Sequence, residues 1–131
     1  MKWGRFVTKL VLIADDNVVV RRALRQVFQY ESDFEVCAEA GNGREAVELV
    51  EEYKPDLVVL DLSMPIMNGL DAARAIKRVL PEVPVILFSN YSDKFSEQEA
   101  RSAGISAMVS KTESVAVLVT KARLLVNQLA A

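Results

Sequence analysis

Residues 57–69 read Leu-Val-Val-Leu-Asp-Leu-Ser-Met-Pro-Ile-Met-Asn-Gly. The first four are branched and apolar, and the turn-forming residues Pro55 and Pro65 stand on either side of them. A short apolar run bounded in this way predicts a β-strand that is buried on both faces. The strand ends at Asp61, and parallel α/β sheets keep their ligand sites at the carboxyl ends of their strands. We therefore predict that Asp61 lies at a functional edge of a sheet.

Four further segments are interpreted as strands, because each is rich in apolar residues and is followed by polar or turn-forming ones: residues 10–14, 34–40, 85–88 and 105–110. Polar side chains mark the ends of three of them. The first ends at two adjacent carboxylates, the third at a hydroxyl and the fourth at an ammonium group: Asp15 and Asp16, Ser89, and Lys111.

Between these strands, apolar residues recur at the three- and four-residue spacing of amphipathic helices. The expected core-facing residues, helix by helix, are Val20, Leu24, Val27 and Phe28; Ala46, Leu49, Val50 and Tyr53; Ala72, Ala73, Ile76, Val79 and Leu80; and Val115, Leu118, Val119, Ala122, Leu125, Val126 and Leu129. Val117 and Leu124 widen the last face beyond what one sheet needs. The opposite face of the first helix carries Arg21, Arg22, Arg25 and Gln26.

Capping residues set the expected helix bounds. Asn17 is suited to cap the first helix, and Lys54 ends the second because the residue before a proline is pushed out of helical space. A shorter fourth helix is expected to run to about residue 102. The cap expected for it is Ser92 or Asp93, and the cap expected for the last helix is Thr112 or Ser114.

Strands that alternate with helices through short turns predict a doubly wound α/β domain with a five-stranded parallel sheet and five helices. Five strands fit the flavodoxin-like strand order 2-1-3-4-5. The switch point of that order lies between the strand ends that carry Asp15, Asp16 and Asp61. Residues 1–9 are interpreted as an N-terminal extension that contains Trp3 and Phe6, and residues 10–131 as one domain.

Composition excludes several classes of function. A net charge of -2 with both signs interspersed gives no basic field, so we expect no direct nucleic-acid binding and no membrane association. The chain has no histidine, which removes Ser-His and Cys-His catalysis, imidazole zinc sites and a phosphohistidine on this chain. Cys37 lies in an apolar run and is interpreted as a buried thiol. Without a signal-peptide core or a membrane-length segment, the chain is expected to be soluble and cytoplasmic.

The polar strand ends should converge on one edge of the sheet. Three carboxylates placed together repel one another, so such a cluster either holds protons at raised pKa or binds a hard cation. Mg²⁺ is the natural candidate and Mn²⁺ the substitute. Lys111 and Ser89 would then contact the oxygens of a transferring phosphoryl group. With no histidine, and with Cys37 elsewhere, Asp61 is the predicted nucleophile, because carboxylates form aspartyl phosphates.

With these residues in place, the chain from about residue 10 to residue 129 resembles the response-regulator receiver domain of two-component signal transduction, which has a chemotaxis-regulator-like fold. The loop at residues 64–69 is also similar to that of the family. The positions that look like the family's functional residues are the acidic pair Asp15 and Asp16, the phosphoacceptor Asp61, the hydroxyl residue Ser89 and the lysine Lys111.

The resemblance implies that a histidine kinase or phosphotransfer protein donates a phosphoryl group from a phosphohistidine to Asp61. It implies direct Mg²⁺ ligation by Asp16 and Asp61, ligation by Asp15 mainly through water, and a further ligand in the backbone carbonyl of Ser63. The resemblance further implies that Ser89 moves toward the phosphate, which later hydrolyses. The resulting repacking would signal to an output domain or a downstream partner.

Three positions depart from the family pattern. Met108 stands where an aromatic switch residue is usual, and a thioether cannot reproduce the hydrogen bond of a tyrosine hydroxyl. Thr112 follows the lysine where many members have proline, and Asn90 follows Ser89 where a small residue is common. Coupling by an aromatic rotor is therefore not expected here.

Two other functions remain open. A Mg²⁺-dependent aspartyl-phosphate phosphohydrolase commonly has a second Asp two residues after the nucleophile, where this chain has Ser63. A receiver-like interaction module that is never phosphorylated would act through the wide apolar face of the last helix. That face fits a downstream protein, a homodimer or the lead-in with Trp3 and Phe6. No output domain is predicted in this chain. Its helix and loop sequence, especially at residues 60–65, is nevertheless similar to that of receivers that precede a helix-turn-helix domain.

Overall fold

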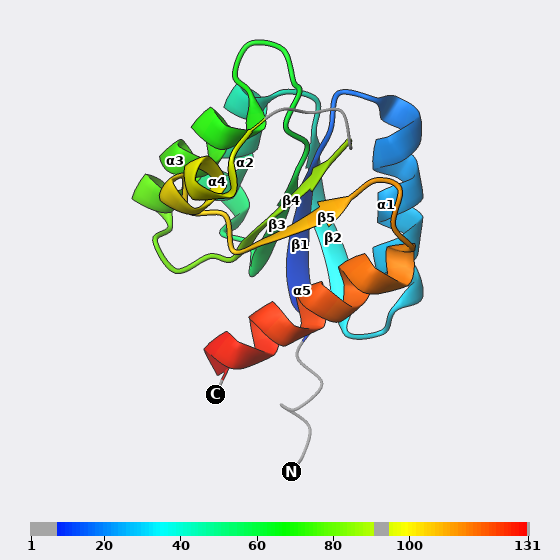
Figure 1. Cartoon of the computed structure of the whole chain (residues 1–131). Helices are drawn as coiled ribbons and strands as arrows, with labels where there is room; N and C mark the ends of the chain where they lie inside the picture. Colours follow the sequence, from blue (N-terminus) through cyan, green and yellow to red (C-terminus); the bar gives the residue numbers. More distant parts are fainter. Residues whose placement is uncertain (1–7, 91–94, 131) are drawn as a thin grey trace.

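The computed structural model describes residues 8–90 and 95–130, with side chains up to residue 127. Its core is a parallel sheet in the order β2-β1-β3-β4-β5, which confirms the predicted doubly wound, flavodoxin-like topology (Figure 1). The strands are β1 (Lys9–Ala14), β2 (Phe34–Ala40), β3 (Leu57–Leu60), β4 (Val85–Ser89) and β5 (Ala107–Ser110).

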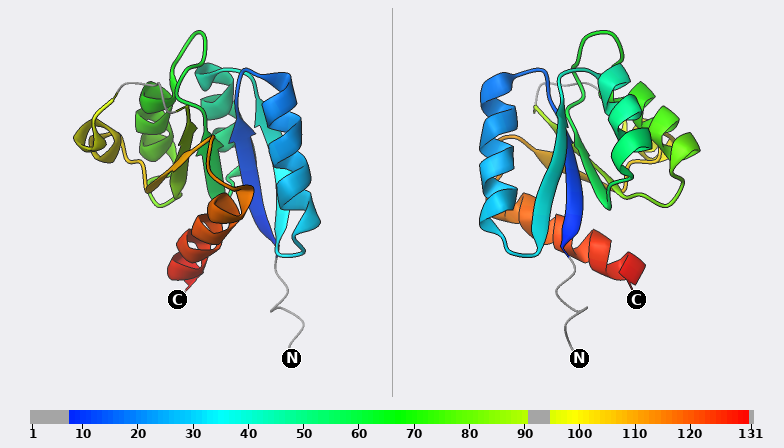
Figure 2. Two further views of the ribbon diagram at one scale, coloured as in Figure 1. Left: turned by 45° about the vertical axis from the view of Figure 1, so that its right-hand side comes forward. Right: turned by 180° about the vertical axis from the view of Figure 1, so that it is seen from behind.

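Helices cover both faces of the sheet. They are α1 (Val18–Tyr30), α2 (Gly43–Tyr53), α3 (Gly69–Val79), α4 (Glu97–Ser102) and α5 (Val115–Ala130). Helices α1 and α5 lie on one face, whereas α2, α3 and α4 lie on the other (Figure 2). Right-handed crossovers between parallel strands place the helices in these two layers. No helix in the described part of the chain is long and apolar enough to cross a membrane.

Strand β3 is buried on both faces, as the run at residues 57–60 predicts. Leu57 and Val59 belong to the apolar cluster under α1 and α5, whereas Val58 and Leu60 belong to the cluster under α2, α3 and α4. Side chains alternate between the faces of a strand, so a central strand needs apolar residues at every position.

The register of the central strands fixes the switch point. In β1, Ala14 pairs with Ala40 of β2 on one side and with Leu60 of β3 on the other. Just beyond these pairs, the Asp61 amide donates to the Ala14 carbonyl over 2.8 Å. The carboxyl ends of β1 and β3 therefore lie side by side, and the residues that follow them share one edge.

Three predicted core positions are wrong, because Tyr53, Val79 and Val115 are exposed. Each is the first or last residue of its helix. Leu124 is 58% exposed and lies on the outer side of α5. The predictions for Trp3, Phe6 and the Leu129 side chain fall outside the described residues.

Helix α4 begins later than predicted. Its cap is Ser96, whose hydroxyl accepts from the Glu99 amide over 2.9 Å, while the Glu99 carboxylate accepts from the Ser96 amide over 3.0 Å. This capping box is encoded by the Ser96-x-x-Glu99 spacing. The alternative caps Ser92 and Asp93 lie outside the described residues.

Candidate phosphoryl-acceptor site

Three carboxylates meet at the switch point, where the strand order predicts them. Asp15, Asp16 and Asp61 each offer an oxygen, and these oxygens lie within 4.8 Å of one another. Asp15 and Asp61 are buried, whereas Asp16 is exposed. The cluster therefore has two carboxylates inside the protein and one at its opening.

Lys111 joins the two buried carboxylates. Its Nζ lies 2.9 Å from Asp15 Oδ2 and 3.1 Å from Asp61 Oδ1. Both contacts are ion pairs by distance, but neither oxygen receives a hydrogen bond of good geometry from the described residues. Buried oxygens normally have such partners. The lysine thus balances charge while leaving both oxygens able to accept another ligand.

The pKa values of both partners in this contact are raised, for different reasons. Burial raises the pKa of Asp61 to about 6, and the neighbouring Asp15 charge adds to burial while Lys111 opposes it. Burial alone would lower the pKa of Lys111, but the Asp15 and Asp61 carboxylates beside it raise that pKa above its usual value. At neutral pH the site therefore holds an ionised Asp61 at a free-energy cost.

This cost should appear in the pH dependence of stability. Asp61 has a pKa of about 6 in the folded protein and about 3.9 when unfolded, so the folded state binds more protons in this window. The stabilisation that Asp61 gives the folded state is fully present below the pKa of the unfolded chain and is lost as pH rises through about 6. Relative to Asp61→Asn, wild type should lose about 2–3 kcal/mol of unfolding free energy between pH 4 and 7.

Urea unfolding with a metal chelator measures this difference at both pH values. The subtraction removes the opposite contribution of Asp33 and Glu39, whose pKa values are held below normal by hydrogen bonds from arginines that outweigh burial. If the difference in unfolding free energy between wild type and Asp61→Asn does not change with pH, the raised pKa of Asp61 is contradicted.

The donor set fits a hard divalent cation. All three side chains supply carboxylate oxygens, which Mg²⁺ prefers, and the two incompletely satisfied oxygens point to a missing ligand. Ser63 is exposed in the loop that follows Asp61, two residues along the chain. These residues would hold Mg²⁺, with water completing its coordination.

Ser89 and Met108 lie at the neighbouring strand ends. Ser89 is buried, and its carbonyl accepts from the Lys111 amide over 2.8 Å. Met108 is partly buried on β5. Both residues line a cavity of about 330 Å³ whose other lining residues are Asn90, Phe95, Glu97, Val109, Ser110 and Glu113. Ser89 and Met108 thus line one cavity at the ends of β4 and β5.

Two of the arginines predicted on the polar face of α1, Arg21 and Arg25, form ion pairs that were not predicted from the sequence. Both pair with Glu39 of β2, and the side chains of Arg21 and Glu39 are only 20% and 22% exposed. Glu39 is 18 residues from Arg21, so helical spacing gives no signal for the pair. Cys37 is also less buried than predicted: it is half-buried on β2, and its thiol donates to the Val11 carbonyl over 3.5 Å.

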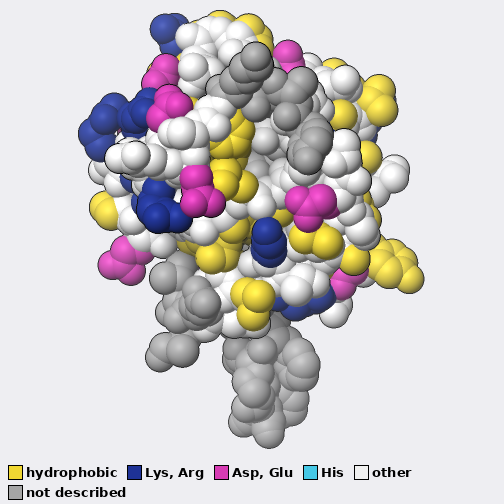
Figure 3. Space-filling view, viewed as in Figure 1, with side chains coloured by type: hydrophobic (Ala, Val, Ile, Leu, Met, Phe, Trp, Pro, Cys, Tyr) yellow, Lys and Arg dark blue, Asp and Glu magenta, His cyan; other side chains and the backbone are white. Residues whose placement is uncertain are grey.

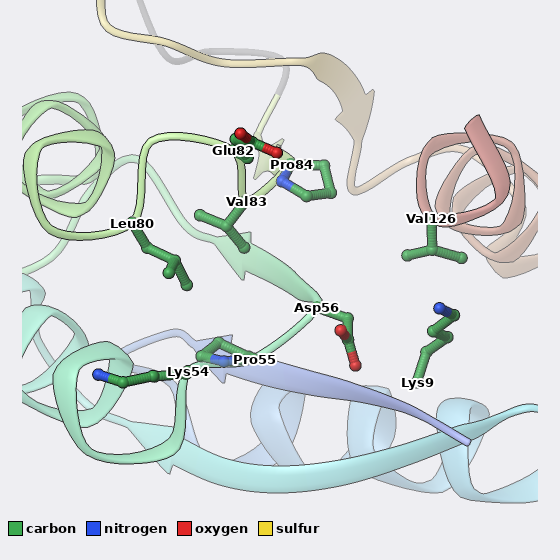
Figure 4. Close-up of a pocket in the computed structure, with 9 residues that line it drawn as sticks. All are labelled: Lys9, Lys54, Pro55, Asp56, Leu80, Glu82, Val83, Pro84 and Val126. Carbon is green, nitrogen blue, oxygen red and sulfur yellow. The ribbon is translucent and has the colours of Figure 1, made fainter. Parts of the chain in front are cut away.

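A separate hollow lies at the opposite edge of the sheet (Figure 4). It has a volume of about 330 Å³ and is lined by residues that begin strands or end helices: Lys9, Lys54, Pro55, Asp56, Leu80, Glu82, Val83, Pro84 and Val126. Asp56 accepts there from the Leu10 amide over 2.8 Å, which ties two strand starts together. The hollow shares no residue with the carboxylate cluster.

The fold and the site define a class of protein: a doubly wound α/β domain with an acidic, lysine-bridged centre at its switch point. The chain belongs to the response regulator receiver domain family, whose model matches residues 11–123. Receiver domains are signalling modules of two-component systems. The predicted membership is thereby confirmed.

Individual relatives agree with this assignment. The chain is 43% identical over 97 residues to the transcriptional regulatory protein YhcZ of Bacillus subtilis, covering 74% of this chain and 45% of that protein. It is 38% identical over 124 residues to the transcriptional regulatory protein PdtaR of Mycobacterium tuberculosis, covering 93% and 58%. The response regulator domain of Thermotoga maritima CheB superposes with a TM-score of 0.84 at 28% identity, covering 92% and 97%. The chain thus spans roughly half the length of these two curated relatives.

Proposed function

We propose that this domain accepts a phosphoryl group on Asp61 and changes conformation in response. The observation that carries the proposal is the placement of Lys111 Nζ between the buried oxygens of Asp15 and Asp61. A fixed cation beside a buried carboxylate is suited to the charge of an incoming phosphoryl group. The proposed donor is the phosphohistidine of a sensor kinase or phosphotransfer protein.

In the transfer step, an Asp61 oxygen forms a bond to phosphorus while the bond from phosphorus to the donor nitrogen breaks. The released imidazole keeps that bonding electron pair and takes up a proton. Lys111 and Ser89 contact the phosphoryl oxygens. Water later cleaves the acyl phosphate, which regenerates Asp61 and inorganic phosphate. The domain thereby catalyses only its own phosphorylation and dephosphorylation.

Mg²⁺ would be held by Asp16 and Asp61 directly, by Asp15 through water and by the Ser63 carbonyl. When bound, the cation supplies positive charge that neutralises the phosphoryl oxygens. Asp15 and Asp61 already share Lys111, so the chain itself provides the second positive charge of the site.

Labelling with a small phosphodonor tests the function. Acetyl phosphate with Mg²⁺ should add one phosphoryl mass to the intact chain, and chelation of the metal should prevent the addition. Absence of any addition would favour an interaction module that is not phosphorylated. Sustained turnover of an exogenous phosphoester would favour a phosphohydrolase.

We propose that the exposed side of α5 is the surface through which the domain passes its signal to a partner. Apolar side chains are exposed there among charged ones, as Figure 3 illustrates for one face of the molecule. Val115 lines a groove of about 610 Å³ between α1 and α5, and Leu124 lines a second one of about 350 Å³ on α5. These surfaces fit a downstream protein, a segment that follows in a longer protein, or a second copy of the domain.

If a second copy binds there, phosphorylation should promote dimer formation. Wild type treated with acetyl phosphate and Mg²⁺ should then sediment faster than the untreated protein, whereas Leu124→Glu should not, because a buried carboxylate would oppose the contact. Val79→Glu, an exposed site on α3 on the opposite face, serves as the matched control. A wild type that stays monomeric when fully labelled would leave the surface to a different protein.

A further inference from the structure

Three hydrogen bonds hold Asp15, two through its backbone and one through its side chain. Its amide donates to the Ala40 carbonyl over 3.0 Å, and its Oδ1 accepts from the Asn17 amide over 2.9 Å. Its carbonyl accepts from Nη1 of Arg21 over 2.8 Å. The first two contacts join neighbours in sheet or sequence. The third comes from the second turn of α1, and it is the contact that ties the acidic loop to a helix.

Arg21 is itself anchored. Its Nε donates to Glu39 Oε1 over 3.1 Å, so one guanidinium bridges the Asp15 carbonyl and the Glu39 carboxylate. Arg25 pairs with the other oxygen of Glu39. Burial opposes ionisation of Glu39, but the hydrogen bonds from Arg25 and Arg21 outweigh it and hold its pKa below the usual value. The guanidinium fork therefore has a fixed, ionised partner on β2.

The charge of Arg21 argues against a direct attraction for the cation. A guanidinium near a metal site repels a divalent ion, so charge alone would make Arg21 unfavourable for metal binding. A planar fork, by contrast, can hold two acceptors in a set geometry, which a lysine cannot reproduce. The benefit of Arg21 must therefore come from geometry.

We propose that Arg21 is a positioning residue for the metal-binding carboxylates, acting through the Asp15 carbonyl, with Glu39 holding Arg21 in place. This inference rests on the proposed function. Positioning residues around metal ligands commonly change metal affinity by about 10–100-fold when they are replaced. Because Arg21 contacts backbone and not a ligand atom, we expect the low end of that range.

Mg²⁺ titration by calorimetry on metal-free protein tests the inference. Arg21→Lys keeps the charge and loses the bridge, so its Kd should rise about 10-fold. Arg21→Ala removes a repelling charge, yet its Kd should also rise. Glu39→Gln should change the Kd in the same direction by a smaller factor. Arg22→Ala, the exposed neighbour on α1, is the matched control and should bind as wild type does.

A second readout reports position directly. The Asn17 amide donates to the Asp15 carboxylate, so its NMR shift and hydrogen-exchange protection should change in Arg21→Lys and stay the same in Arg22→Ala. Thermal melts of each metal-free variant establish that titrations are made on folded protein. Equal Kd values for wild type and Arg21→Lys, or tighter binding by Arg21→Ala, would overturn the positioning role while leaving Asp61 phosphorylation intact. A wild type that binds no Mg²⁺ would overturn both.

Discussion

Asp61→Asn should abolish phosphoryl addition from acetyl phosphate and Mg²⁺, the largest effect expected for any single change in this chain. The amide keeps the shape of the side chain but has no anionic oxygen to attack phosphorus. Asp61 is the buried carboxylate that follows the central strand, and its Oδ1 lies 3.1 Å from Lys111 Nζ. Intact-mass measurement after incubation should show one added phosphoryl group on wild type and none on the variant.

Lys111→Ala should be labelled alongside Asp61→Asn, because it tests the lysine separately from the nucleophile. It leaves the nucleophile in place and removes the ammonium that contacts both buried carboxylates. Labelling should persist on Asp61 but proceed more slowly, because the positive charge beside the phosphoryl oxygens is gone. Peptide mapping assigns the modified residue. Labelling of Asp61→Asn at the wild-type rate, or on any other carboxylate, would reject Asp61 as the acceptor.

Gly69→Ala should destabilise the domain and slow labelling, because Gly69 lies directly against the backbone of the acceptor. A Cβ at this position would lie 2.2 Å from the Asp61 carbonyl oxygen and 2.9 Å from Leu62 Cα. Both neighbours are backbone atoms, so one of the two segments has to shift. The Gly69 amide also donates to the Leu62 carbonyl over 2.8 Å, which holds the segments together.

Two effects of opposite sign decide the size of the loss. Alanine is favoured over glycine in a helix by about 1 kcal/mol, and less at its first turn. Forcing extra volume into a packed site costs about 1–3 kcal/mol, and here the obstacle is rigid backbone. We expect a net loss of about 2 kcal/mol in urea unfolding. A displacement of about 1 Å at Asp61 should also slow labelling by up to about 100-fold.

Gly41→Ala is the matched control for this substitution. Its Cβ would lie 3.5 Å from Arg21 Nη1, which is an ordinary van der Waals contact. Its stability should therefore stay within about 0.5 kcal/mol of wild type. If Gly69→Ala were as stable and as reactive as Gly41→Ala, the close approach of α3 to the acceptor loop would not matter for the site.

The loop between Asp61 and Gly69 contains a residue with a positive φ angle. Ile66 has φ of 71°, which is unusual for a β-branched residue, and its side chain is exposed. The following residue, Met67, donates to the Pro65 carbonyl over 2.7 Å and accepts from the Gly43 amide over 3.1 Å. A Cβ on Gly43 would lie 2.2 Å from that same Met67 carbonyl. Two glycines thus let α2 and α3 approach the acceptor loop closely.

The sequence by itself determined the sheet, its strand order and the residues at its polar edge. Continuous apolar runs such as residues 57–60 predict central strands because both faces of a central strand must be buried. The carboxyl ends of parallel strands share one edge, so Asp15, Asp16, Asp61, Ser89 and Lys111 had to be near one another. These inferences need only strand periodicity and the rules of parallel topology.

Tertiary structure alone decided which side chains are covered and which residues of different elements contact one another. Tyr53, Val79 and Val115 are exposed at the ends of their helices, and the spacing of apolar residues does not encode how well a helix end is covered. The ion pair of Arg21 with Glu39 joins residues 18 apart, and only the packing of α1 against β2 brings them together. Likewise, the contact of one lysine with two buried carboxylates depends on the register of β1, β3 and β5. Periodicity specifies which face a side chain occupies, whereas its partners depend on the distances between elements.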